Sequence, residues 1–89
     1  MGKQRITVDG FEMRLDPGVF DDFELLDMMA QVQNEDALKL PGVMRKIYGD
    51  QYQAVMEHLR DEDTGRVPTE RVGEFMTKTM EALAPKSGS

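Results

Sequence analysis

The acidic run Asp61-Glu62-Asp63 is the part of the sequence whose residue types and spacing come nearest to a site for chemistry. Alternating carboxylates before a glycine are typical of a calcium-binding EF-hand loop, because a hard cation needs several fixed oxygen ligands. Here Gly65 comes one position early, and Val72 stands where the bidentate glutamate is required. Too few oxygen ligands remain. We therefore interpret the run as a solvated acidic turn and predict no metal site.

Other residues with catalytic potential lack the partners that catalysis requires. His58 is the only histidine, and the sequence has no cysteine. His58 therefore lacks a cysteine or a second histidine as a catalytic partner, and a thiolate metal site cannot form. The acids Asp21 and Asp22 point in different directions on a helix, and acids are common at helix starts in any case. No Gly-rich phosphate loop is present. We predict that the protein is not an enzyme and uses no cofactor.

The composition limits the class of protein further. The 89 residues suffice for one domain with modest stability. Lys and Arg total 11 and Asp and Glu total 17, so 11 − 17 gives a net charge of −6. This balance argues against a nucleic acid or an anionic membrane as the partner, because both require basic patches. The lack of cysteine fits a reducing cytosol, and no apolar run approaches the roughly 20 residues of a membrane span.

A β-hairpin is predicted over residues 5–15. Apolar and polar residues alternate on both sides of Asp9-Gly10, which is a strong signal for a two-residue turn. The apolar members of this pattern are Ile6, Val8, Phe11, Met13 and Leu15. Because a lone hairpin is only marginally stable in water, its apolar side should lie against helices.

The rest of the sequence predicts a mainly α domain of about four helices. The apolar residues recur at helical spacing over residues 21–33, 41–48, 50–60 and 69–84. Pro41 suits the first turn of the second helix, and Pro85 ends the fourth. We therefore expect a single domain over residues 1–84 and a flexible tail over residues 85–89.

The first helix is expected to organise the core. Asp21 with Glu24 three residues later forms a capping-box pattern at its start. Its apolar positions are Phe23, Leu26, Met29 and Val32, with Leu25 and Met28 widening the stripe. The residues predicted to share one core are Phe23, Leu26, Tyr52, Met56, Phe75 and Leu83.

The methionines are the main compositional signal for a partner. Methionine at helical spacing is most often part of a core, but flexible thioethers also suit surfaces that adapt to apolar partners. Six methionines lie at or beside the predicted apolar faces, which would make a loosely specified core for so small a domain. We therefore predict that Met28, Met76 and Met80 contribute to a protein-binding groove or to an interface between copies of the chain.

Several short motifs, taken in order, resemble one family. They are Asp21-Asp22-Phe23-Glu24-Leu25-Leu26, Leu40-Pro41, Ile47-Tyr48-Gly49, His58-Leu59-Arg60-Asp61-Glu62-Asp63 and Gly65-Arg66-Val67-Pro68. With a last amphipathic helix they resemble the tail assembly chaperones of long-tailed bacteriophages and prophages, especially those of Gram-positive hosts. The resemblance covers residues 21–83 and leaves the hairpin outside. Thr64 departs from the pattern as an extra residue in the turn.

The resemblance implies a helical chaperone in the cytoplasm of the host bacterium. Such a protein binds the long tape measure protein, keeps it soluble while the tail tube polymerises, and leaves before the tail is complete. The resemblance also implies a second, longer form, produced by a frameshift near Ala84-Pro85-Lys86. Two other interpretations stay open. One is a small acidic interaction module that regulates or inhibits another protein, and the other is a calcium sensor.

Overall fold

The computed structural model describes residues 3–34 and 36–83 and begins with the predicted hairpin. Strands β1 (Gln4–Val8) and β2 (Phe11–Leu15) pair antiparallel, with Val8 opposite Phe11. Asp9 and Gly10 form the turn with φ values of 52° and 81°. Positive φ at both positions defines the turn type whose twist matches that of the paired strands, and glycine adopts it without steric cost.

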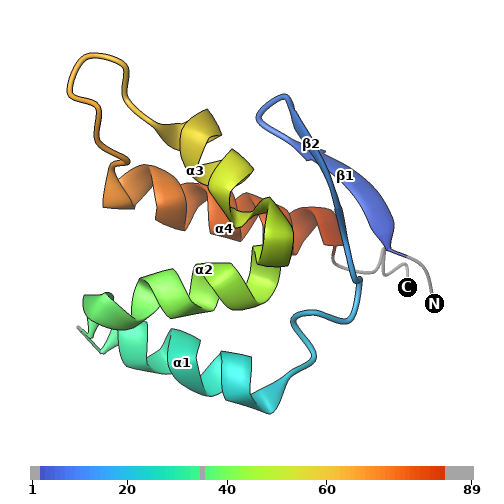
Figure 1. The fold of residues 1–89 in the computed structure, drawn as a ribbon. Coiled ribbons are helices and arrows are strands. Elements are labelled where there is room, and N and C mark those ends of the chain that lie inside the picture. Colours follow the sequence, from blue (N-terminus) through green and yellow to red (C-terminus); the bar gives the residue numbers. More distant parts are fainter. Residues whose placement is uncertain (1–2, 35, 84–89) are drawn as a thin grey trace.

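Helices make up most of the remaining chain, so the prediction of a mainly α fold with an N-terminal hairpin is confirmed (Figure 1). The helices are α1 (Phe23–Gln33), α2 (Leu40–Tyr48), α3 (Tyr52–Leu59) and α4 (Thr69–Leu83), with 3-10 turns η1 (Ala37–Lys39) and η2 (Gly49–Gln51). Residues 37–59 form one run of helical turns that bends at Gly49, where φ is 55°. Counted as continuous segments, the described helices number three, slightly fewer than the four predicted. The predicted tail and the frameshift position lie outside the described residues.

Helix α1 begins one residue later than its capping pattern suggested. Asp22, not Asp21, is the N-cap, and its carboxylate accepts hydrogen bonds from the backbone N–H groups of Glu24 (3.0 Å) and Leu25 (3.4 Å). Lys46 Nζ of α2 lies 3.2 Å from the same carboxylate and is the main cause that lowers the pKa of Asp22. This ion pair links the cap to α2, and the rotation of α1 about its axis decides which of its apolar residues are buried.

That rotation overturns part of the predicted core. Phe23 is 85% exposed and Leu26 is 48% exposed, so the prediction that they are buried was wrong. The buried face of α1 centres on Leu25 instead, with Met28, Met29 and Val32 packed against the core. The apolar stripe of α1 is too wide for one buried face, and the structure buries one edge of it and leaves the other in solvent.

The centre of the core is the fully buried ring of Phe75 on α4. Its centroid lies 5.8 Å from that of Tyr48 on α2 and 6.2 Å from that of Phe11 in the hairpin. Tilted and edge-on pairs at such separations add to the stabilisation from burial. The predictions that Phe75 and Leu83 are buried are confirmed, while Tyr52 and Met56 are half-buried at the edge of the core.

A buried hydrogen bond accompanies these rings. Thr79 Oγ1 donates its proton to the carbonyl of Phe75 (2.9 Å), so the hydroxyl of Tyr48, 2.7 Å away, must be the donor to Thr79. Burial is the main reason that the pKa of Tyr48 rises to about 12. The bond ties α2 to α4 with no buried side-chain polar atom left unsatisfied among the described residues.

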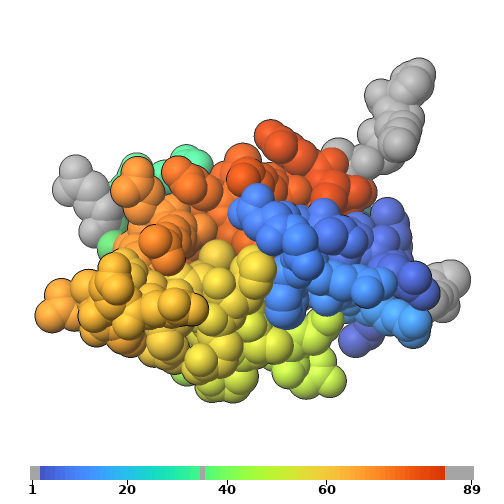
Figure 2. Space-filling view, turned by 90° about the horizontal axis from the view of Figure 1, so that it is seen from above, coloured from blue at the N-terminus to red at the C-terminus, as the bar shows by residue number. Residues whose placement is uncertain are grey.

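Polar contacts hold the hairpin against the helices, and Figure 2 shows it packed beside α4. Lys78 of α4 pairs with Asp9 in the turn at 2.8 Å, and this pairing raises the pKa of Lys78. The side-chain amide of Gln51 bonds both backbone groups of Arg14, donating to its carbonyl at 2.6 Å and accepting from its N–H at 3.1 Å. Gln51 therefore satisfies part of the outer edge of β2 much as a neighbouring strand would.

We expect the Phe75→Ala variant to lose about 3 to 5 kcal/mol of unfolding free energy, because the substitution leaves a cavity among buried rings. Phe23→Ala removes the same ring from an exposed position and is the matched control, with an expected loss under about 0.5 kcal/mol. Urea melts of both variants measure the difference. A loss under about 1 kcal/mol for Phe75→Ala would contradict the assigned core.

The raised pKa of Tyr48 predicts a specific alkaline weakening. The folded-state value of about 12 exceeds the unfolded value of about 10, so the fold favours the protonated phenol. Its stabilising contribution is complete below pH 10 and is lost progressively as the pH rises to 12, by at most about 1.4 kcal/mol per pH unit. The Tyr48→Phe variant has no phenol and therefore lacks this pH-dependent contribution to stability. Urea melts should show the stability advantage of the wild type over this variant shrinking from pH 10 to 12; a constant difference would contradict the assignment.

Candidate protein-binding surfaces

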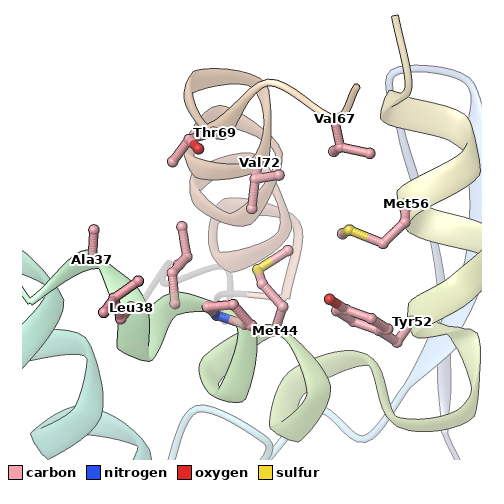
Figure 3. A pocket seen from close by; sticks show the side chains of 10 residues that line it. Ala37, Leu38, Met44, Tyr52, Met56, Val67, Thr69 and Val72 are labelled. Carbon is pink, nitrogen blue, oxygen red and sulfur yellow. The ribbon is translucent and has the colours of Figure 1, made fainter. Parts of the chain in front are cut away.

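An apolar hollow of about 350 Å³ opens between α2, α3 and the start of α4 (Figure 3). We call it the apolar hollow. It is lined by Ala37, Leu38, Leu40, Pro41, Met44, Tyr52, Met56, Val67, Thr69 and Val72.

Each wall of the hollow comes from a different element. The 3-10 turn η1 holds Leu38 at the rim, where it is 91% exposed, while Met44 of α2 is buried at the base. Figure 3 shows Met56 of α3 and Val72 of α4 directed towards the same space from opposite sides. The guanidinium carbon of Arg45 lies 4.9 Å from the ring centroid of Tyr52, within cation–π range.

The lining determines what the hollow can bind. Among the described residues, the side-chain polar groups that line it are the hydroxyls of Tyr52 and Thr69, without a carboxylate, amine or imidazole. Such a lining offers apolar contact to a side chain or a helix face. The hollow is therefore a candidate site for binding an apolar group.

A second apolar surface lies where α1 faces α4. Met29 of α1 and Met76 of α4 line one small hollow of about 50 Å³. The two helices run in opposite directions in Figure 1. Leu26 lies one turn before Met29 on α1, and Met80 lies one turn after Met76 on α4. We call this hollow the α1–α4 groove; besides the two methionines it is lined by Val32, Gln33, Leu40 and Val43. Phe23, Leu26 and Met80 are the exposed large apolar side chains of the two helices, with Met80 at 37%.

The structure separates the three methionines predicted to bind a partner. Met76 lines the α1–α4 groove, and Met80, one turn further along α4, is 37% exposed. Met28 is half-buried against α2, with its methyl carbon 3.0 Å from where a Cβ on Gly42 would lie. Partner binding by these methionines stays a prediction.

Three exposed apolar residues were missed as candidates for binding. Leu38, Phe23 and Leu26 are the most exposed of the large apolar side chains in the described chain. The excess width of the α1 stripe could have identified the latter two. Leu38 gives a weaker signal, since it stands between Ala37 and Lys39, just ahead of the helix predicted to begin at Pro41.

The acidic run and His58 contact other parts of the chain in ways that support the fold. The N–H of Asp63 donates to the carboxylate of Asp61 at 2.8 Å, and the N–H of Asp61 donates to the carbonyl of Arg66 at 2.8 Å. These bonds close the turn on itself. In residues 3–34 and 36–83 no group of three or more acidic or histidine side chains is placed to hold a metal ion. The ring of His58 lies 5.0 Å from that of Phe11.

Comparisons with known proteins gave no assignment, because neither a family model, nor a curated protein, nor a solved structure matches the chain. Within the part of the chain that the structure describes, no helix is both long enough and apolar enough to cross a membrane. What the protein does has to be inferred from its motifs and its two apolar surfaces.

The different surroundings of the methionines predict different effects of polar replacement. Met80→Gln should lower the unfolding free energy by less than about 1 kcal/mol, because the side chain is partly in solvent. Met28→Gln, with the same change of side chain, should cost about 1 to 3 kcal/mol, since it places an amide between α1 and α2. Urea melts compare the two. Equal losses would show that Met80 belongs to the core.

Proposed function

We propose that the protein is a tail assembly chaperone of a long-tailed phage or prophage, which binds the tape measure protein and keeps it soluble during tail morphogenesis. The observation that carries the proposal is the exposure of large apolar side chains, above all Phe23 and Leu38, on a small acidic domain. The ordered motifs over residues 21–83 supply the identity of the family.

The apolar surfaces and the net negative charge of the domain both suit a chaperone. A long helical client exposes an apolar stripe until its assembly partners cover it, and an apolar surface can shield that stripe in the meantime. Methionines in the α1–α4 groove adjust to stripes of different shape. The net charge of −6 keeps the complex soluble through repulsion between copies.

The alternative function is a small acidic interaction module that regulates or inhibits another protein. The apolar hollow favours it, because a compact hollow of about 350 Å³ would accept one or two anchoring side chains of a partner. A regulator of this kind binds one folded partner. Unlike a chaperone, it would not raise the solubility of an unassembled tape measure protein.

Co-expression with the tape measure protein encoded near this gene tests the proposal. We expect its soluble fraction to rise several-fold, and the double variant Leu38→Ser/Phe23→Ser to lose most of this rise, since the two most exposed large apolar side chains are removed. Gln53→Ser, an exposed polar position on α3, is the matched control and should behave as the wild type. An unchanged soluble fraction with the wild-type protein would reject the chaperone function and leave the interaction module.

A further inference from the structure

The most exposed large apolar side chain among the described residues stands at the rim of the apolar hollow. Leu38 is 91% exposed and lines the hollow from the 3-10 turn η1 (Figure 3). A large apolar side chain in water indicates an interaction surface when further apolar surface lies beside it. Here the neighbouring apolar surface is concave. A protruding side chain and a hollow therefore share one face of the molecule.

Leu38 leaves the hollow beside it unfilled. The space measures about 350 Å³, and the side chain of Met44 at its base is buried. Tyr52 and Met56 of α3 line the side opposite η1 (Figure 3). A leucine that enters from outside would meet apolar atoms on several sides, as in the pockets that anchor partner side chains at interfaces. The chain thus presents both halves of a contact, an apolar anchor and a pocket for one.

The charged residues next to the anchor have opposite signs. Asp36 and Lys39 flank Ala37 and Leu38 in the sequence, and both are exposed. Neither has an ion-pair partner among residues 3–34 and 36–83, and the carboxylate of Asp36 makes no capping hydrogen bond to η1. Lys46, by contrast, pairs with Asp22 on the α1 side of α2. One anion and one cation beside Leu38 are therefore available to pair across an interface.

We infer that the chain forms a symmetric dimer in which each copy places Leu38 in the apolar hollow of the other. In a two-fold arrangement one patch serves both copies, so the leucine contact is made twice. Asp36 of each copy would pair with Lys39 of the second copy, which fixes the relative orientation. The dimer covers Leu38 and leaves Phe23 of α1 exposed. The inference thus goes beyond the proposed function and does not depend on it.

Self-complementarity favours a second copy over other occupants of the hollow. A different protein could fill the hollow and still leave Leu38 in water, whereas a second copy covers both at once. Two-fold dimers are also the commonest oligomers of soluble proteins. An anionic lipid surface is repelled by the net charge of −6. Because the patch is small, we expect a weak dimer with a dissociation constant of about 10 μM to 1 mM.

Sedimentation equilibrium of the isolated protein tests the inference over about 0.02 to 2 mM, a range that brackets the expected dissociation constant. The mass of the wild type should approach twice that of the chain and stop there. Leu38→Ser should weaken association by at least roughly tenfold. Phe23→Ser is the matched control, because it removes a similarly exposed apolar side chain from α1, and it should associate as the wild type does.

Two further sets of variants test the hollow and the charges. Thr69→Trp fills the hollow from the start of α4 and should weaken association as Leu38→Ser does, while Thr77→Trp adds the same ring at an exposed position on α4 outside the hollow and should not. Asp36→Lys and Lys39→Asp should each weaken the dimer at low salt. The double variant restores both cross-pairs and should recover the wild-type affinity. Urea melts establish that every variant is folded.

Each contrary result overturns a stated part of the inference. A wild type that stays monomeric over the whole range removes the dimer. Equal association of Leu38→Ser, or loss of association with Phe23→Ser, removes the assigned anchor, and equal association of Thr69→Trp removes the assigned pocket. A mass beyond twice that of the chain excludes the closed two-fold arrangement, and a double charge variant as weak as the single ones excludes the ion pairs. None of these measurements uses the tape measure protein, so the dimer and the chaperone function stand or fall separately.

Discussion

The packing of Tyr48 and Thr79 around Phe75 is the constraint on which the rest of the structure depends. The bond between the two hydroxyls, 2.7 Å long and fully buried, fixes α2 against α4, and the ring of Phe75 joins both helices to Phe11 of the hairpin. A buried hydroxyl without a partner costs about 1 to 3 kcal/mol. The contact therefore holds only when α2 and α4 keep one relative position, and this position sets the walls of the apolar hollow.

Helix α1 takes no part in the contact between Tyr48, Thr79 and Phe75, and it packs mainly against α2. Its N-cap is held by Lys46, and Met28 packs against Gly42. Contacts of this kind fix one side of the helix. Towards α4, Met29, Val32 and Met76 line a small hollow, and Leu26, one turn before Met29, is 48% exposed.

Features of the fold that depend on local interactions could be predicted from the sequence, and features that depend on distant contacts could not. Asp9-Gly10 specifies its own turn, and the regular spacing along α4 identifies Phe75 as buried, so these features were predictable. The rotation of α1 was not, because contacts with residues distant in the sequence, such as that of Met28 with Gly42, decide which edge of a wide stripe is buried. The apolar hollow was missed for the same reason: four separate segments line it, and no single helical pattern reveals a concave surface.

Leu40 connects the two apolar surfaces. It lines the apolar hollow on one side of α2 and the small hollow of the α1–α4 groove on the other, and it is only 8% exposed. A single layer of side chains thus separates the surfaces, and close packing transmits a displacement on one side to the other. A displacement of Met76 or Met29 would therefore also press on the wall of the hollow. The two surfaces are parts of one apolar region around the start of α2, and the buried contact between Tyr48 and Thr79 anchors the far end of that helix.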